Sequence, residues 1–225
     1  MNLDFLAPSS GAAIGRSPMQ RSAADEGARF EVRDGFDVAV AYGADPEAER
    51  RTAASTAGWA DVSHLRKLEL QGPAQELAGV PLELGSASWA RDAWWCPLTP
   101  TRTLVIGSAQ VTATSATSVT DVTTTFAALT LVGPQATEVL ARFSALDLRA
   151  EKTPVGALRP GSIARQPALL IHEAPQRYLF LFGWATAEYV WSVVADAGHH
   201  LGGRPIGADA LALLAETEIA GAGRA

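Results

Sequence analysis

Apolar and polar positions follow the same pattern in two segments that begin sixty residues apart. The first has Asp-Val-Ser at 61–63, alternating apolar residues around 68–70, and Gly-Pro at 72–73. The second repeats this order with Asp-Val-Thr at 121–123 and Gly-Pro at 133–134. Each copy predicts a turn, a strand, a break and a short helix, because proline suits the first turn of a helix. The repeat therefore predicts a duplicated α+β fold whose halves bury one face against each other.

Strand periodicity is also clear outside the repeat. Residues 36–42 alternate with period two, which predicts a half-buried strand. The stretch 111–125 is dominated by Thr, Ser and Val, a composition typical of exposed or edge strands. Two hairpins are predicted from paired apolar runs, 92–98 with 103–106 and 168–172 with 178–182.

Three longer helices are predicted from their end signals. The first begins at Asp45-Pro46, where aspartate caps and proline takes the first turn, and ends at Gly58. The second runs from Thr186 as cap to Ala197, with Gly198 at its end. The third begins after Pro205-Ile206-Gly207 and continues through Leu214.

The periodic segments divide the chain into a central domain and two tails. Residues 1–28 are rich in Ala, Ser and Gly without a sustained period, so we expect a tail that is flexible or bound to a partner. The domain is expected at 29–215, with halves of about 29–110 and 111–215. Residues 216–225 are expected to form a loose C-terminal tail.

Composition excludes several classes of protein. In 225 residues, 48% are hydrophobic, but no apolar run is long enough to span a membrane, and the start lacks the features of a secretory signal. The net charge of −6, with mixed signs, argues against nucleic-acid binding. A single cysteine, Cys96, cannot form an internal disulfide. These features predict a soluble cytoplasmic protein that binds neither nucleic acid nor membrane.

No strong catalytic or metal-binding motif is present. The sequence lacks a dinucleotide fingerprint, a phosphate-binding loop and a Gly-x-Ser-x-Gly turn. None of the histidines, at 64, 172, 199 and 200, has a second ligand at metal spacing, so no metal site is expected. The pair His199-His200 follows a predicted helix, where capping is favoured over metal binding. Cys96 is expected to be a small buried apolar residue.

Trp94 and Trp95 are neighbours on a predicted strand, so their side chains must face opposite sides of the sheet. One of them therefore points away from the core of its own sheet. A helix could cover that second face, or the tryptophan could anchor a partner, since aromatic residues are enriched at interfaces. Both interpretations remain open from the sequence.

The order of these motifs resembles the glycine-cleavage T-protein superfamily of folate-dependent aminomethyltransferases. The resemblance rests on 58–63 with Gly72-Pro73, on the strand that ends at Gly133-Pro134, and on Pro205-Ile206-Gly207. Within the superfamily the chain is most similar to gamma subunits of heterotetrameric sarcosine oxidases, through Arg16-Ser17-Pro18-Met19 and the Thr-rich stretch 121–125. The resemblance implies an α+β fold with mixed and antiparallel sheets, here without the C-terminal barrel domain of T-proteins.

The resemblance also implies where site residues would lie and how they differ. The paired-aspartate element of T-proteins corresponds to Arg91-Asp92, so one acid is replaced by a cation. The Gly-Tyr-Thr-Gly-Glu element corresponds to the segment from Arg165 to Glu173 and is lost, and the expected late arginine falls near Ala215. Asp92 and Glu173 are therefore the only candidates for vestigial catalytic residues. A locally paired surface carboxylate is the competing interpretation of each.

These departures imply a non-catalytic assembly subunit of a complex that oxidatively demethylates sarcosine and passes the one-carbon unit to tetrahydrofolate. FAD, FMN, NAD and tetrahydrofolate would be used by the complex and carried by larger flavoprotein subunits, and none would bind to this chain alone. Trp94, Trp95, Arg16 and Pro18 are the candidate partner contacts. A stand-alone folate-binding aminomethyltransferase and an unrelated α+β binding module are the alternatives.

Overall fold

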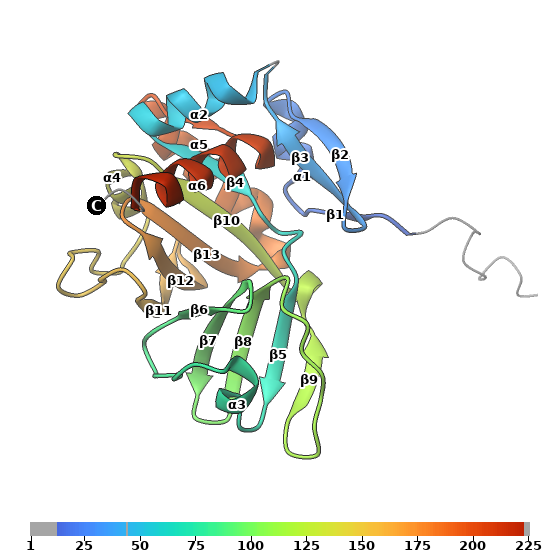
Figure 1. The fold of residues 1–225 in the computed structure, drawn as a ribbon. Coiled ribbons are helices and arrows are strands. Elements are labelled where there is room, and N and C mark those ends of the chain that lie inside the picture. Colours follow the sequence, from blue (N-terminus) through green and yellow to red (C-terminus); the bar gives the residue numbers. More distant parts are fainter. Residues whose placement is uncertain (1–12, 44, 223–225) are drawn as a thin grey trace, which may run out of the picture.

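The computed structural model describes residues 13–43 and 45–222, which form three sheets and the helices around them (Figure 1). The five-stranded sheet has the order β6-β7-β8-β5-β9 and the six-stranded sheet the order β11-β12-β13-β10-β4-β14. The five-stranded sheet contains β5 (Lys67–Gln71), β6 (Ser88–Ala90), β7 (Ala93–Thr99), β8 (Arg102–Gly107) and β9 (Ser118–Asp121). The six-stranded sheet contains β4 (Gly58–Asp61), β10 (Phe126–Val132), β11 (Leu158–Ile163), β12 (Gln166–Ala174), β13 (Arg177–Gly183) and β14 (Arg204–Pro205).

The two sheets have the same topology, which confirms the duplicated α+β fold. Position by position, β6-β7-β8-β5-β9 matches β11-β12-β13-β10-β4. In both copies the strand of the repeat is followed by a helix, α3 (Gln75–Ala78) after β5 and α4 (Ala136–Ala141) after β10. Both predicted hairpins are confirmed as β7–β8 and β12–β13, and β9 is an edge strand as its composition predicts.

The two copies exchange strands at their junction. The strand before the first Asp-Val-Ser turn, β4, pairs with β10, so that Asp61 lies opposite Leu129. The strand before the second turn, β9, pairs with β5, so that Asp121 lies opposite Leu68. Each sheet therefore contains one strand that precedes the turn of the other copy, and the chain crosses between the sheets twice.

Equivalent hydrogen bonds hold the two crossings. The backbone N–H of Ser63 donates to Asp61 Oδ1 at 2.9 Å, and that of Thr123 donates to Asp121 Oδ1 at the same distance. The Ser63 hydroxyl accepts the N–H of Ala128 at 3.1 Å, while the Thr123 hydroxyl accepts the N–H of Lys67 at 3.0 Å. Each turn thus caps the strand of the other copy, which explains why Asp and a hydroxyl residue occur in both.

The segment before the sheets forms its own small layer. Strands β1 (Gly15–Arg16), β2 (Arg29–Arg33) and β3 (Phe36–Ala41) make a three-stranded sheet, and α1 is Gln20–Asp25. The prediction of a tail at 1–28 falls partly outside the described residues, which begin at 13. Within the described part, Met19 and Ala23 are fully buried in the core, so this segment packs on the domain.

Helices pack against the faces of the two large sheets in three apolar clusters. One apolar cluster joins α1, α4 and α5 (Ala187–His200) to one face of the six-stranded sheet. A second lies between the two large sheets and reaches α2 (Pro46–Ser55) and α6 (Ala208–Ala222). A third places α3 against the outer face of the five-stranded sheet, as Figure 1 shows. The helix α6 extends through Ala222, so most of the expected tail at 216–225 is part of this helix.

Three details of the predicted helices are wrong. Asp45 caps α2 as predicted, but the helix ends at Ser55, and Gly58 begins strand β4. Gly198 lies within α5, where an added Cβ would come within 2.4 Å of Trp59, so this glycine permits close packing and does not end the helix. Thr186 occupies the cap position of α5 without capping it, because its hydroxyl donates to the Gly183 carbonyl.

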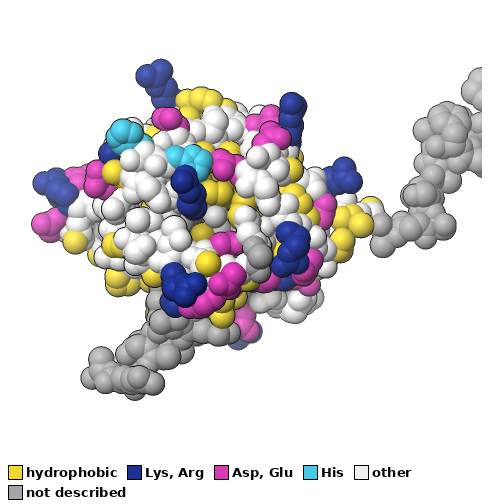
Figure 2. Space-filling model, turned by 90° about the horizontal axis from the view of Figure 1, so that it is seen from above, with side chains coloured by type: hydrophobic (Ala, Val, Ile, Leu, Met, Phe, Trp, Pro, Cys, Tyr) yellow, Lys and Arg dark blue, Asp and Glu magenta, His cyan; other side chains and the backbone are white. Residues whose placement is uncertain are grey.

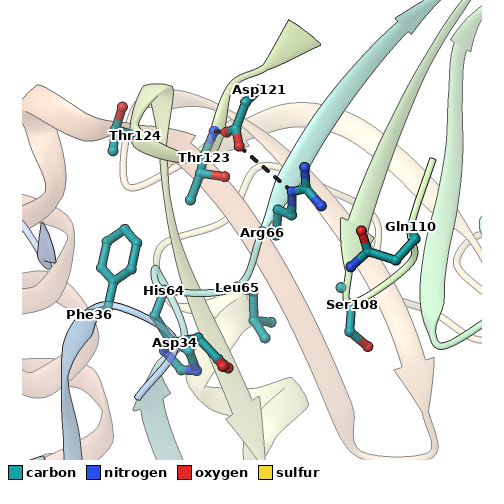
Figure 3. A pocket seen from close by; sticks show the side chains of 11 residues that line it. Asp34, Phe36, His64, Leu65, Arg66, Ser108, Gln110, Asp121, Thr123 and Thr124 are labelled. Carbon is teal, nitrogen blue, oxygen red and sulfur yellow. Dashed lines mark hydrogen bonds and ion pairs between the residues drawn. The ribbon is translucent and has the colours of Figure 1, made fainter. Parts of the chain in front are cut away.

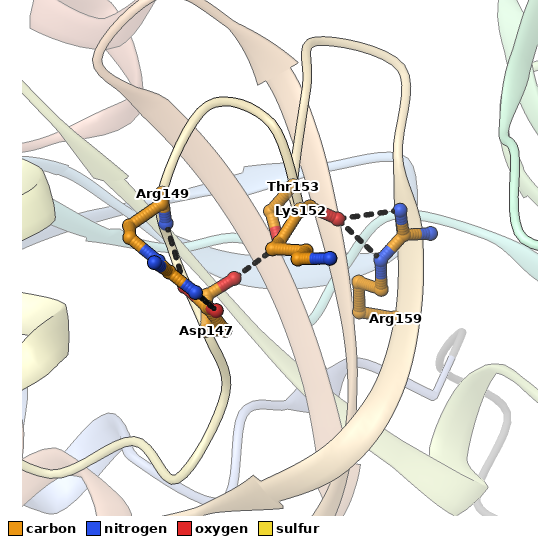
Figure 4. Close-up of polar contacts among 5 residues, drawn as sticks. All are labelled: Asp147, Arg149, Lys152, Thr153 and Arg159. Carbon is orange, nitrogen blue, oxygen red and sulfur yellow. Dashed lines mark hydrogen bonds and ion pairs between the residues drawn. The ribbon is translucent and has the colours of Figure 1, made fainter.

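Arg159 fastens a loop of the second copy to a loop of the first. Its guanidinium donates to the Lys152 carbonyl at 2.7 Å, as Figure 4 shows. It also donates to the Gly85 carbonyl, in the first copy, at 2.6 Å. Asp147 begins the same loop, with its side chain paired to Arg149 and its carbonyl accepting the Thr153 hydroxyl at 2.7 Å. These bonds give the 147–157 segment a fixed shape although it lacks helix and strand.

Candidate functional site

Asp92 lies at the tip of a hairpin and is exposed. It forms the tight turn between β6 and β7 together with Arg91, and both have positive φ, at 57° and 53°. Its carbonyl accepts the backbone N–H of Ser108 at 3.0 Å. The backbone of Asp92 is therefore next to the end of β8, while its carboxylate faces solvent.

Glu173 lies at the contact between the two large sheets. Its carboxylate accepts the indole N–H of Trp94 at 2.8 Å and the Nε of Arg177 at 3.2 Å. The side chain is only 12% exposed, so these bonds form in a partly dry environment. Trp94 belongs to β7 and Glu173 to β12, so this carboxylate links one copy of the fold to the other.

Replacing Trp94 by Phe should lower the free energy of unfolding by about 1 to 2 kcal/mol, because the Glu173 carboxylate loses a hydrogen bond that is partly shielded from water. Chemical denaturation measures the change. In a double-mutant cycle with Glu173→Ala, which removes the acceptor, the two substitutions should be less than additive. Strict additivity would show that the indole and the carboxylate do not interact.

The two tryptophans of β7 do face opposite sides, as predicted, but neither forms an exposed anchor. Trp95 is fully buried between the sheet and α3, and its role as a partner contact, like that of Trp94, stays a prediction. Trp94 packs between the sheets. The exposed tryptophan is Trp89, 56% exposed, whose ring meets that of Trp94 edge-on. Trp89 lies on the short edge strand β6, and it was not predicted from the sequence as an exposed aromatic residue.

The other candidate partner contacts, Arg16 and Pro18, lie just before the start of α1. Arg16 is exposed in β1 and Pro18 is half-buried. Their role in binding a partner stays a prediction.

A cleft, called here the central cleft, lies where the two copies cross (Figure 3). It has a volume of about 570 Å³ and is lined by residues from both Asp-Val-hydroxyl turns, from the β2–β3 hairpin and from the end of β8. The lining residues are Asp34, Phe36, His64, Leu65, Arg66, Gly107, Ser108, Gln110, Asp121, Thr123 and Thr124. Because the Ser108 N–H donates to the Asp92 carbonyl, the cleft adjoins the counterpart of the paired-aspartate element of T-proteins.

One wall of the cleft carries two side chains of opposite charge, the Arg66 guanidinium and the Asp121 carboxylate. Arg66 Nε lies 3.7 Å from Asp121 Oδ2 (Figure 3). Burial alone would raise the pKa of Asp121, but the hydrogen bonds from Thr123 and the Arg66 cation outweigh it and lower the pKa below its usual range. Asp121 is therefore an anion at neutral pH and cannot serve there as a proton donor.

His64 and Lys67 are the perturbed bases near the cleft. Burial is the main effect that lowers the pKa of the His64 imidazole, and the Asp61 carboxylate opposes it. Lys67 is fully buried, and burial lowers its pKa to about 8. Its ammonium donates to the carbonyls of Ser63 and Leu65, both at 2.9 Å, so it braces the first turn from inside.

This arrangement could hold a polar ligand of moderate size. His64, Arg66, Ser108 and Gln110 offer hydrogen-bond donors, and Asp34 offers an acceptor. None of these residues was predicted as a site from the sequence, although His64 directly follows the first Asp-Val-Ser turn. The repeat itself was the signal that could have found them. If two equivalent turns exchange strands, the turns must meet, and the residues beside them are then brought together.

Among the described side chains, in residues 13–43 and 45–215, no three of His, Cys, Asp or Glu are arranged to hold a metal ion. Over the same residues, no helix is long and apolar enough to cross a membrane. Cys96 is fully buried, and burial raises the pKa of its thiol, in accord with an apolar packing role.

Solved structures with this fold include two enzymes. The chain is similar to the glycine cleavage system aminomethyltransferase T from Bartonella henselae, with a TM-score of 0.71, 16% identity and coverage of 88% of this chain and 61% of that one. It is also similar to a chain of the heterotetrameric sarcosine oxidase from Corynebacterium sp. U-96 in complex with pyrrole 2-carboxylate. There the TM-score is 0.58 and the identity 19%, with coverage of 68% of this chain and 90% of that one.

The chain thus spans 61% of the length of the aminomethyltransferase. Among curated protein sequences no match is found. The family described as the GCVT N-terminal domain matches residues 101–220, which include the second Asp-Val-Thr turn, the Gly-Pro break and helix α5. Since this match spans more than half of its 225 residues, the chain belongs to the GCVT N-terminal domain family.

Proposed function

We propose that this chain is a non-catalytic, gamma-type assembly subunit of a sarcosine oxidase complex. That complex would oxidatively demethylate sarcosine and pass the one-carbon unit to tetrahydrofolate. The observation that carries the proposal is the placement of the two inherited acids. Asp92 is exposed on a hairpin tip, and Glu173 is bonded to Trp94 and Arg177, so neither acid lines the central cleft.

The coverage of the sarcosine oxidase chain also supports this role. Because 68% of this chain covers 90% of that one, the matching chain is shorter than this one. A chain of that size accommodates this fold and little else, which suits a small subunit of a larger assembly. Under the proposal, larger flavoprotein subunits carry FAD, FMN and NAD and use tetrahydrofolate, and the complex works in the cytoplasm.

Co-expression with the flavoprotein subunits from the same organism tests the assembly role. The purified chain alone should show no flavin absorbance and no micromolar affinity for tetrahydrofolate by calorimetry. In the co-expressed sample it should elute with the larger subunits, and omitting it should lower the yield of assembled complex. A chain that binds tetrahydrofolate tightly by itself, or that never associates with the flavoproteins, would overturn the proposal.

A stand-alone folate-binding aminomethyltransferase is the second candidate. The cleft of about 570 Å³ favours it, because its polar lining adjoins the Asp92 backbone. If this role holds, Arg66→Ala should weaken tetrahydrofolate binding, and Asp92→Asn should abolish turnover without loss of stability. Unchanged binding in Arg66→Ala, together with no measurable transferase activity in the parent protein, would exclude this candidate.

A further inference from the structure

The outer edge of β9 has no strand beside it, whereas the equivalent edge in the second copy has one. The counterpart of β9 is β4, and β14 pairs with β4 in parallel. In Figure 1, β9 is the outermost strand of the lower sheet. Within residues 13–43 and 45–222, β5 is the only strand that pairs with β9. The first copy therefore lacks the sixth strand that the second copy has.

The register of β9 shows which of its backbone groups face outward. The N–H of Val122 donates to the Lys67 carbonyl at 2.9 Å, and bonded pairs alternate along an antiparallel ladder. Thr120 is therefore bonded to β5, whereas Val119 and Asp121 direct their N–H and C=O groups away from it. These outward groups are available for a further strand.

The pairing of β14 shows how a strand binds to such an edge. Trp59 in β4 corresponds to Val119 in β9, since each lies two residues before the aspartate of its turn. The N–H of Ile206 donates to the Trp59 carbonyl at 2.9 Å, and that of Arg204 donates to the Ala57 carbonyl at 3.2 Å. A segment that ran parallel to β9 in the same register would donate to the Val119 carbonyl in the same way.

The composition of β9 also sets it apart from the other edges. Exposed edge strands usually carry charges or proline, which prevent unwanted pairing. Both outer strands of the six-stranded sheet do so, with Arg159-Pro160 in β11 and Arg204-Pro205 in β14. The face around α2 carries side chains of both charges interspersed (Figure 2). By contrast, residues 108–120 contain no charged residue and no proline, so nothing in this sequence opposes pairing with another strand.

The side chains of β9 determine which sequence would fit beside it. On the face toward α3, Val111 and Val119 are half-buried against the apolar cluster that joins α3 to the sheet. On the other face, Ser118 and Thr120 are exposed, and Thr120 lies opposite Glu69 of β5. Since successive side chains of a strand alternate between faces, a matching strand would alternate apolar and polar residues.

We propose that an extended segment of a larger flavoprotein subunit pairs with β9, running parallel to it and alternating apolar and polar side chains. The inference rests on the proposed assembly role and names the surface that would carry it. The carbonyls of the segment would accept the N–H groups of Val119 and Asp121. Two copies of β9 related by a twofold axis would pair antiparallel, whereas β14 pairs in parallel, so the β14 mode favours a different chain.

Co-expression of the full chain with the flavoprotein subunits, followed by size-exclusion chromatography, tests the proposal through substitutions on β9. Val119→Pro removes an outward N–H but none of the bonds to β5, and proline is tolerated on edge strands. It should reduce the co-eluting fraction of the chain about tenfold. Thr120→Lys places a charge on the same edge and should reduce it several-fold, whether or not the proline variant folds. As a matched control, Thr101→Lys adds the same charge at the exposed β7–β8 turn and should leave co-elution unchanged.

Hydrogen exchange resolved to single amides provides a second measurement. In the free chain the amides of Val119 and Asp121 should exchange rapidly, whereas that of Thr120, bonded to β5, should be protected. In the complex the first two amides should exchange at least about tenfold more slowly.

The outcomes separate this inference from the assembly role. If the parent chain co-elutes with the flavoproteins, but Val119→Pro and Thr120→Lys co-elute equally well and the outward amides stay unprotected, the pairing is overturned and the assembly role stands. A parent chain that never associates with the flavoproteins would overturn both. A free chain that sediments as a dimer, and as a monomer when Thr120 is replaced by Lys, would show that a second copy occupies the edge, and would also overturn the proposal.

Discussion

Gly133→Ala should lower the free energy of unfolding by about 3 kcal/mol or more, because the added methyl group has no space and the backbone conformation disfavours it. Gly133 has a φ of +108°, and a Cβ built there would lie 2.2 Å from the Ala53 carbonyl oxygen and 2.8 Å from that of Thr56. Both atoms belong to the backbone, so neither can move aside without distorting α2 or the segment after it.

The same substitution in the first copy should have a similar effect. Gly72 has a φ of +130°, and its Cβ would lie 2.2 Å from the Ala116 carbonyl oxygen. In both copies the segment that precedes the exchanged strand, β9 at Gly72 and β4 at Gly133, passes directly over this glycine. The Gly-Pro break is therefore a site of close backbone approach, which only glycine permits.

A matched glycine separates strain from steric overlap. Gly35 has a φ of +78° but nothing within 4 Å of its Cβ position, so Gly35→Ala should cost only about 1 kcal/mol. Urea denaturation of the three variants measures the difference. If all three lost the same stability, backbone strain alone would account for the effect, and the close approach would be energetically unimportant.

The local elements were predictable because their signals are local. Asp45 and Pro46 predicted the start of α2, and the alternating runs predicted both hairpins, since capping and periodicity depend on neighbours in sequence. The duplicated α+β fold followed from two matching segments. Each of these predictions is confirmed by the strand order and the helix bounds.

The exchange of strands between the copies was not predictable in the same way. Nothing in the sequence of β4 indicates that it pairs with β10 rather than with β5, because register and partner depend on contacts across many residues. Gly198 shows a related failure: the sequence presents a helix-ending glycine, but the side chain of Trp59 on a distant strand occupies the space where a Cβ would lie. Tertiary packing overrides the local signal there.

The candidate site was missed for the same reason. The resemblance pointed to Asp92 and Glu173, whereas the cleft is lined by His64, Arg66 and Asp121 beside the crossing. A single sequence cannot reveal that two turns sixty residues apart meet, unless the repeat is first interpreted as an exchange of strands.

Lys67→Met should remove a pH dependence of stability that the parent protein has between about pH 8 and pH 10. Burial lowers the pKa of Lys67 from 10.5 to about 8 in the folded chain. In this range the unfolded chain binds more protons than the folded one, so parent stability rises as pH increases. The penalty for charging the buried amine is fully present below pH 8 and amounts to about 3 kcal/mol at most.

Free energies of unfolding measured at pH 7, 8, 9 and 10 test this, with the difference between parent and variant as the observable. The variant also leaves the carbonyls of Ser63 and Leu65 without the ammonium donor, which costs stability at every pH and does not change the slope. The relative stability of the parent should therefore improve with rising pH. If the difference in free energy of unfolding between parent and variant were the same at every pH, Lys67 would keep its ordinary pKa. The crossing of the two copies would then accommodate the charged ammonium without penalty.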